Sequence, residues 1–367
     1  MVIMGMRLIN LTLVVAMYTL CSCAFVVGDA SSDEASKEGG SCLISVPTHR
    51  LHNGVEMPLL SLGTAQLITV PGVDPDLPSD FIGFLPERNY RQMELALTTG
   101  VRAFDTAFMY RSQPPMGRVL AEWFQKGRLE SRQDVWITSK IFHPPGPSFE
   151  ISHMPHMANM TPEEVSVETK RHFEVSLHEL GVGYIDLMLL HWPSLPSMTD
   201  ANMNRQRRLA AWKVLEEMYD RGWARAIGVS NFSPEHLEQL KEDGANIVPM
   251  VNQIEGSITL QNPNIVKYCL DNNILPQAFS PLGRGLSEMP ELVHQIGETY
   301  GKDTGQVSFR YLLQLGYAVT YLTNSEKRMV SNAQVFDFEL SDDEMSQLAA
   351  LNRPDGGWGL PNPNDLK

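Results

Sequence analysis

The stretch DLMLLHWP at residues 186–193 decides the fold more than any other, because an apolar run of strand length ends abruptly in residues that can do chemistry. Two earlier stretches have the same form, FDTAFMY at residues 104–110 and ITSK at residues 137–140. A fourth, IGVSNF at residues 227–232, ends in a hydroxyl and an amide. Polar residues at the ends of successive apolar strands are typical of a reaction centre on the rim of a parallel barrel.

Apolar segments of strand length alternate with helical patterns along the rest of the chain. We expect strands at Leu60–Gly63, Ala103–Asp105, Val135–Ser139, Ile185–Leu190, Ala226–Val229, Val251–Gln253, Leu275–Phe279 and Ala318–Leu322. This repetition predicts an α/β fold of the (β/α)8 TIM-barrel type. A doubly wound open sheet is the alternative, but GRG at residues 283–285 lacks the third glycine of a dinucleotide-binding fingerprint.

Helices are predicted where apolar residues recur at helical spacing. Val165–Leu180 carries such a stripe and stops at Gly181, which is typical of a helix C-terminus. A second stripe, in residues 212–219, precedes Gly222, and a third helix is expected at Glu235–Glu242. Before the first barrel strand, HRLHNGVEMPLL at residues 49–60 contains an Asn-Gly turn signal and predicts a β-hairpin that closes the barrel bottom.

The composition is that of an ordinary soluble globular protein, with 367 residues, 43% hydrophobic and 20% charged. The net charge is −14 and no basic cluster interrupts it, which argues against nucleic acid as a partner. The sequence carries no signal for an oligomeric state. An anionic ligand would need a local binding device, because the overall field repels it.

The amino terminus divides into two segments that we expect to lie outside the fold. Met1–Ala24 has one charge, an apolar run and small residues before a plausible cleavage site, which is the layout of a secretory signal peptide. Residues 25–44 form a polar, acidic spacer with no periodicity, and we expect it to be disordered. The barrel domain is then expected at 45–353 and a carboxy-terminal tail at 354–367.

This leader predicts the secretory pathway, either secretion or the endoplasmic reticulum lumen, and a mature form without a membrane segment. An uncleaved membrane anchor and plastid targeting are the alternatives. The two cysteines beyond the leader, Cys42 and Cys269, either pair or stay as free thiols. Asn159 begins an N-glycosylation acceptor sequence, although Pro162 follows it closely. No cysteine or aspartate accompanies the three histidines at positions 143, 153 and 156, so no metal site is predicted.

The residues on the expected barrel rim suit carbonyl reduction. This reaction needs a hydride for the carbonyl carbon and a proton for its oxygen. Tyr110 can supply the proton if Lys140 lowers its pKa, and Asp105 can keep that lysine charged and in place. His191 can donate a hydrogen bond that orients the substrate oxygen.

In this order and in these contexts, the four segments resemble the aldo-keto reductase family, and the resemblance runs from about Val46 to Leu351. It implies that Asp105, Tyr110, Lys140 and His191 are the catalytic residues. It also implies NADP(H) as the cofactor and a small-molecule aldehyde or ketone as the substrate. A low-turnover NADP(H)-binding protein, or a secreted interaction protein on the same barrel, is the alternative.

The resemblance also implies a set of cofactor-binding residues. They are Gly63, Thr64, Ser230, Asn231, Gln253, Phe279, Ser280, Leu282, Arg328 and Asn332. The match weakens at residues 321–323, where Tyr-Leu-Thr stands in place of the Pro-Lys-Ser of NADPH-preferring members. Because Leu322 cannot pair with a phosphate, we expect weakened selectivity for the 2′-phosphate, with NAD(H) use as an extension. Trp192 is expected to line the substrate pocket, and Trp358 either lines it or covers the barrel.

Overall fold

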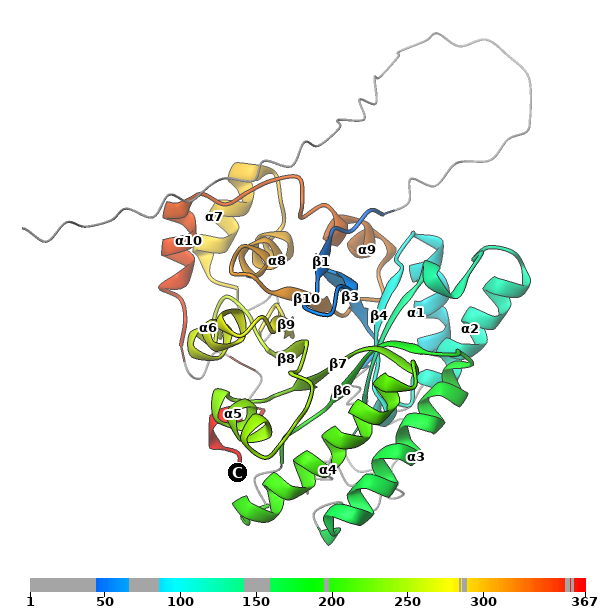
Figure 1. Cartoon of the computed structure of the whole chain (residues 1–367). Coiled ribbons are helices and arrows are strands. Elements are labelled where there is room, and N and C mark those ends of the chain that lie inside the picture. Colours follow the sequence, from blue (N-terminus) through cyan, green and yellow to red (C-terminus); the bar gives the residue numbers. More distant parts are fainter. Residues whose placement is uncertain are drawn as a thin grey trace, which may run out of the picture. The chain divides into compact units, whose positions relative to one another are not determined.

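The computed structural model describes residues 44–65, 86–141, 159–194, 198–283, 285, 289–353, 357 and 360–367. Within them, eight parallel strands close into a barrel in the order β10-β3-β4-β5-β6-β7-β8-β9, and helices surround it (Figure 1). The predicted (β/α)8 barrel is therefore confirmed. The strands are β3 (Leu60–Gly63), β4 (Ala103–Asp105), β5 (Trp136–Ile141), β6 (Ile185–Leu190), β7 (Ala224–Ser230), β8 (Val251–Glu255), β9 (Leu275–Phe279) and β10 (Ala318–Tyr321).

The helices follow the strands in the order that the sequence predicts. They are α1 (Pro86–Thr98), α2 (Gln113–Gln125), α3 (Pro162–Leu180), α4 (Ala201–Asp220), α5 (Pro234–Glu242), α6 (Pro263–Asp271), α7 (Glu291–Tyr300), α8 (Thr304–Gln314), α9 (Glu326–Ala333) and α10 (Asp342–Ala349). Short 3-10 turns include η1 (Phe108–Tyr110), η2 (Arg132–Asp134) and η5 (Pro363–Asp365).

Local signals explain where the helices begin and end. α3 begins three residues earlier than predicted, because Thr161 accepts a hydrogen bond from the Glu164 backbone N–H while the Glu164 side chain accepts one from the Thr161 N–H. It ends at Gly181, whose φ of 64° favours glycine. Ser233 caps α5 in the same way before Pro234.

Strand β5 is longer than predicted. The predicted strand ended at Ser139. In the structure Lys140 pairs with Leu189, and Ile141 pairs with Leu190 of β6. The strand can continue because the lysine side chain is buried rather than solvated.

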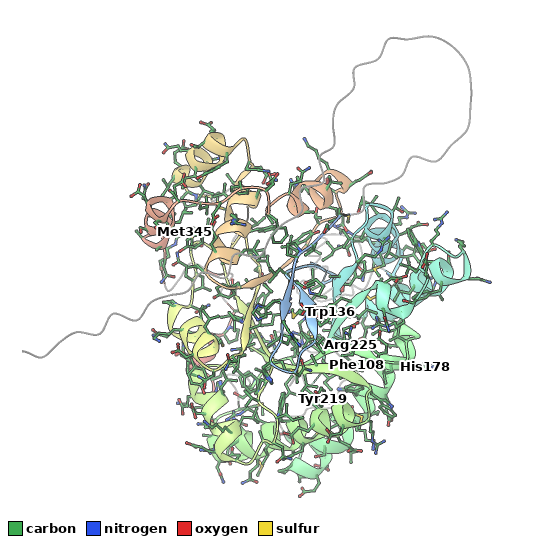
Figure 2. All side chains as sticks on the ribbon, turned by 45° about the horizontal axis from the view of Figure 1, so that its top comes forward. Phe108, Trp136, His178, Tyr219, Arg225 and Met345 are labelled. Carbon is green, nitrogen blue, oxygen red and sulfur yellow. The ribbon has the colours of Figure 1, made fainter. Side chains whose placement is uncertain are left out.

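The predicted hairpin is formed by β1 (Thr48–Arg50) and β2 (Glu56–Pro58), which pair antiparallel. The Asn53 side-chain amide in its turn donates to the backbone carbonyl of Arg225, near the start of β7, at 2.9 Å. The same amide approaches the hydroxyl of Tyr219, near the end of α4, at 3.3 Å. Figure 2 labels both partners. These contacts place the turn at the amino-terminal ends of the strands, opposite the rim that carries His191.

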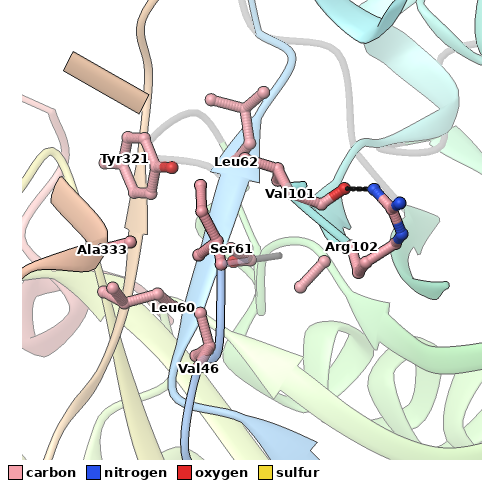
Figure 3. Close-up of a pocket in the computed structure, with 10 residues that line it drawn as sticks. Val46, Leu60, Ser61, Leu62, Val101, Arg102, Tyr321 and Ala333 are labelled. Carbon is pink, nitrogen blue, oxygen red and sulfur yellow. Dashed lines mark hydrogen bonds between the residues drawn. The ribbon is translucent and has the colours of Figure 1, made fainter. Parts of the chain in front are cut away.

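The outer face of β3 contributes to a small hollow that is largely apolar (Figure 3). Its lining includes Ile44 and Val46 from the chain before the hairpin, Leu60 and Leu62 of β3, and Tyr321 of β10. None of the predicted site residues lines this hollow. The hollow therefore belongs to the packing of the barrel wall and is not part of the predicted site.

Two further expectations can be compared with the structure. Cys269 is a buried free thiol, and burial raises its pKa to about 12. Cys42 lies outside the described residues, as do the leader and most of the acidic spacer. Asn159 is exposed just before α3. No helix in the described part of the chain is long and apolar enough to cross a membrane.

Candidate active site

Four predicted residues meet at the carboxyl ends of neighbouring strands. Asp105 ends β4, Lys140 lies near the end of β5, and His191 directly follows β6. Tyr110 ends η1, the turn that follows β4. The register sets these positions, because Asp105 pairs with Thr138 across β4 and β5, and Lys140 pairs with Leu189 across β5 and β6. This is the end of a (β/α)8 barrel at which active sites are built.

Lys140 and Asp105 form a buried ion pair. The lysine Nζ lies 2.5 Å from Oδ1 of Asp105, and it also donates to the backbone carbonyl of Thr106 at 3.0 Å. The exposed fractions are 1% for the lysine and 3% for the aspartate. Burial lowers the pKa of Lys140, and the attraction of Asp105 opposes that change. Such a pair needs hydrogen bonds beyond the ionic contact, and the Thr106 carbonyl supplies one to the lysine here.

Tyr110 faces both the ion pair and His191. Its hydroxyl lies 3.4 Å from Nε2 of His191, and the two rings meet edge to face with centroids 5.6 Å apart. The Nζ of Lys140 lies 5.0 Å from the centre of the tyrosine ring. The imidazole therefore lies beside the phenol oxygen at the rim, and the ammonium lies near the phenol ring.

The pKa of Tyr110 changes in the direction opposite to our expectation. We expected Lys140 to lower it. In the structure, burial raises this pKa well above 10, and the negative charge of Asp105 raises it further. The expectation was wrong because burial, together with the charge of Asp105, outweighs any lowering of this pKa by Lys140. Tyr110 is thus a phenol that holds its proton through the neutral range.

Ser230 and Asn231, at the end of β7, are fixed by hydrogen bonds. The Asn231 side-chain amide donates to the backbone carbonyl of His191 at 3.0 Å and to the Ser230 hydroxyl at 3.1 Å. The Ser230 hydroxyl donates to the backbone carbonyl of Gln253 at 2.8 Å. Asn231 also adopts a left-handed φ of 62°, which is uncommon outside glycine and recurs at binding sites.

Gln253 of β8 binds Asp105 directly. Its Nε2 donates to Oδ2 of Asp105 at 2.8 Å and to Oε1 of Gln277 at 2.8 Å. The resemblance had implied only a cofactor contact for Gln253. Gln277 was missed. Side chains alternate along Leu275–Phe279, so Gln277 shares a face of β9 with the predicted cofactor residue Phe279, and this signal could have revealed it.

Gly63 and Thr64 connect the end of β3 to the residues around Asp105. A Cβ atom on Gly63 would lie 3.3 Å from the backbone oxygen of Tyr321, a tight contact. Thr64 donates through its hydroxyl to the backbone carbonyl of Asp105 at 3.0 Å. Its hydroxyl also meets that of Ser112 at 2.8 Å, and Ser112, which the sequence did not single out, supports this turn.

The remaining predicted cofactor residues follow β9 and β10. Phe279 ends β9 and Ser280 has a left-handed φ of 52°, with its carbonyl accepting from the Gly283 N–H at 2.9 Å. Leu282 is half-buried in the same turn. Arg328 is exposed in the first turn of α9, and Asn332 is buried near its end. An arginine beside a helix amino terminus can hold a phosphate.

Trp192 was expected to line the substrate pocket. Trp192 follows His191 and is buried. Residues 66–85, residues 142–158 and Trp358 lie outside the described residues. The three histidines considered for a metal fall in the second of these stretches. No cluster of metal-ligating side chains occurs among the residues whose positions the structure gives.

With the site defined, comparison with known proteins decides the family. Residues 62–353 match the Aldo/keto reductase family. The chain belongs to that family. Glyoxal reductase of Bacillus subtilis (strain 168) is 34% identical to this aldo/keto reductase over 320 residues, which cover 87% of this chain and 97% of the relative.

Two further comparisons agree with the membership. NADPH-dependent codeinone reductase 1-1 of Papaver somniferum is 32% identical over 320 residues, covering 83% of this chain and 89% of the relative. The crystal structure of the silkworm (Bombyx mori) aldo-keto reductase AKR2E5 complexed with NADPH superposes with a TM-score of 0.67. That pair is 29% identical and covers 84% of this chain and 88% of the other. An NADP-dependent aldo/keto reductase is the assignment that these relatives support.

The chemistry of the site fits the nicotinamide of such a cofactor. Both side-chain N–H groups of Gln253 bind within the protein, and so do those of Asn231. The amide oxygens are then the acceptors that these side chains can offer to a ligand N–H. A carboxamide is a group of that kind.

Proposed function

We propose that the protein reduces a small aldehyde or ketone to an alcohol with NADPH, and that Tyr110 is the proton donor. The observation that carries the proposal is the convergence of the Tyr110 hydroxyl, the His191 imidazole and the Lys140 ammonium at the barrel rim. Family membership and an NADPH-bound structural relative support the same reaction.

Each side chain has a separate part in this proposal. When bound, NADPH supplies the hydride for the carbonyl carbon. The Tyr110 hydroxyl passes its proton to the carbonyl oxygen, and the charge of Lys140 stabilises the phenolate that remains. Asp105 holds Lys140 in place through the 2.5 Å contact. His191, within 3.4 Å of the phenol, orients the same carbonyl oxygen.

Aldehyde-dependent NADPH oxidation tests the proposal. Protein lacking Met1–Ala24 is mixed with NADPH and 4-nitrobenzaldehyde, absorbance is followed, and the alcohol is identified by mass. We expect turnover that falls at least about 100-fold in Tyr110→Phe, because proton transfer contributes that much or more. NADPH binding without turnover would contradict the proposal and favour a low-turnover binding protein.

We also propose that selectivity for the 2′-phosphate is weak. Leu322 is 50% exposed at the position where the resemblance expects a lysine, so Arg328 is the cation left for the phosphate. Leu322→Lys is expected to raise the kcat/KM ratio of NADPH over NADH about tenfold, because a charge-assisted contact contributes roughly 1.5 kcal/mol. Val248→Lys adds the same charge at a position 46% exposed before β8 and serves as the control. An unchanged ratio in Leu322→Lys would refute this proposal.

The leader gives rise to a proposal about location. Its layout supports entry into the secretory pathway, with cleavage after Ala24. Expression in a secretory host is expected to give a secreted product that starts near Phe25. A cytosolic product that keeps Met1 would contradict it.

A further inference from the structure

A row of four uncharged polar side chains crosses the barrel interior next to the ion pair. We call Gln253, Gln277, Thr320 and Ser61 the polar row. Gln253 donates to Oε1 of Gln277 at 2.8 Å, and Nε2 of Gln277 donates to the Thr320 hydroxyl at 3.0 Å. The hydroxyls of Thr320 and Ser61 are 2.6 Å apart. The row thus connects β8, β9, β10 and β3.

All members of the polar row are buried, and Gln277 has an exposed fraction of 0%. Barrel interiors are usually filled by branched apolar side chains. A buried amide without partners destabilises a protein by about 1–3 kcal/mol, so polar groups persist there only when they are fully paired. Each link of the row is paired, and its last link reaches Oδ2 of Asp105 at 2.8 Å.

The orientation of both amides follows from chemistry. The Asp105 carboxylate, paired with Lys140, only accepts hydrogen bonds, so Gln253 has to turn its Nε2 toward it. The second hydrogen of that Nε2 then requires an acceptor, which is Oε1 of Gln277. Gln277 in turn directs its own Nε2 to the Thr320 hydroxyl and, at 3.4 Å, to that of Ser61.

We propose that Gln277 is a positioning residue for the reductase reaction, because with Thr320 it locks the Gln253 amide in one orientation. In that orientation Gln253 keeps an N–H on Asp105 and presents its oxygen to an N–H of the nicotinamide carboxamide. The reversed amide would set an oxygen against the carboxylate. The inference rests on the proposed function for its catalytic part, and its cofactor-binding part can be measured alone.

The test replaces Gln277 with methionine, which keeps the length of the side chain and removes its hydrogen bonds. The matched control is Gln261→Met, since Gln261 is also buried and its amide holds the backbone carbonyls of Ile258 and Leu348. NADPH affinity is read from tryptophan fluorescence quenching. Steady-state kinetics with 4-nitrobenzaldehyde then give kcat and the aldehyde KM separately.

In Gln277→Met the Kd for NADPH is expected to rise about tenfold, which corresponds to one misplaced hydrogen bond. The kcat falls as well, while the aldehyde KM stays within about twofold, because the row meets the site at Gln253 and Asp105. Gln261→Met keeps both the Kd and kcat of the wild type, even if its melting temperature falls equally. A role limited to packing predicts the same behaviour for the two variants.

Thr320→Val removes one hydroxyl at nearly constant shape and provides a second test if Gln277→Met fails to fold. It is expected to shift the Kd in the same direction by about threefold. A wild-type Kd in a folded Gln277→Met protein, or in Thr320→Val when that is the variant that folds, overturns the inference. If the wild type binds NADPH and reduces no aldehyde, the proposed function fails, and the comparison of Kd values still decides the role of Gln277.

Discussion

Two buried aspartates at opposite ends of the barrel make similar contacts but have different roles. Asp105 accepts from Lys140 and Gln253 at the rim. Asp186, at the start of β6, accepts from Arg132 at 2.6 Å and from Arg225 at 2.8 Å, and also from a backbone N–H of β5. Arg225 and Trp136, both labelled in Figure 2, belong to this lower group. Only the ion pair of Asp105 and Lys140 lies beside Tyr110.

This difference between the aspartates predicts distinct mutant phenotypes. Asp105→Asn leaves the buried Lys140 without its counter-charge and should lower the free energy of unfolding by about 3 kcal/mol. Asp186→Asn should lower it by less, because its partners Arg132 and Arg225 have side chains that are 15% and 40% exposed. Only Asp105→Asn should also reduce kcat strongly. Denaturant unfolding and steady-state kinetics on both variants check this. A strong loss of kcat in Asp186→Asn at a temperature where it is folded would contradict the separation.

The Tyr110 pKa predicts a pH profile. The phenol is the acid in reduction, and burial raises its pKa well above 10, so it stays protonated as the pH rises toward that value. The kcat/KM for reduction, which reports groups of the free enzyme, should therefore show no decline from Tyr110 between pH 6 and 9. Measuring kcat/KM across this range provides the check. An alkaline decline near pH 8 that is absent from the residual activity of Tyr110→Phe would argue against the raised pKa.

At the scale of elements, α5 connects the carboxy-terminal tail to the barrel. His236 occupies the third position of α5, and its Nδ1 accepts from the Ser233 backbone N–H at 3.2 Å. The other nitrogen, Nε2, therefore carries the proton and donates to the Leu366 carbonyl at 3.1 Å. Burial, and then the charge of Arg208, lower the pKa of His236 to about 4.

This histidine predicts loss of stability in acid. Unfolded histidine binds a proton below about pH 6.5, whereas folded His236 binds one only below about pH 4, so stability falls as the pH drops through that window. The contribution is about 3 kcal/mol. His172, stacked on Phe108 and also with a pKa of about 4, acts in the same direction.

His236→Gln keeps both hydrogen-bonding groups and cannot titrate. Its free energy of unfolding should change less between pH 6.5 and 4 than that of the wild type, as measured by urea denaturation at each pH. His178→Gln, at an exposed position on α3 that Figure 2 labels, is the control. Equal acid sensitivity in all three proteins would count against the account of α5.

The strands and helices also show which features could be predicted from the sequence. The eight strands and the hairpin were predictable because apolar period and turn residues are local signals. The extension of β5 through Lys140 was missed, because a local pattern does not show that a lysine will be buried by partners on other strands. Gln277 was overlooked for the same reason, since its partners lie on three other strands. The Tyr110 pKa was predicted in the wrong direction, because burial cannot be seen in a chain.

At the scale of the whole molecule, the chain divides into two units, Met1–Gly40 and Ser41–Lys367. Deleting Met1–Gly40 should therefore leave the melting temperature unchanged. Deleting six more residues, through Val46, removes Ile44 and Val46 from their packing against the core. That deletion should lower the melting temperature by roughly 2–4 °C for each kcal/mol lost. Calorimetry on the two truncations checks this, and equal melting temperatures would contradict it.

The barrel, the rim residues and the family membership all support one proposal: Tyr110 protonates a carbonyl oxygen during reduction by NADPH. The most direct measurement is a single turnover of enzyme loaded with NADPH and mixed rapidly with 4-nitrobenzaldehyde, for the wild type and Tyr110→Phe. We predict equal NADPH affinity in the two proteins and a rate of NADPH oxidation lower by about 100-fold or more in the variant. Equal rates in both proteins, or no oxidation in the wild type, would contradict the claim.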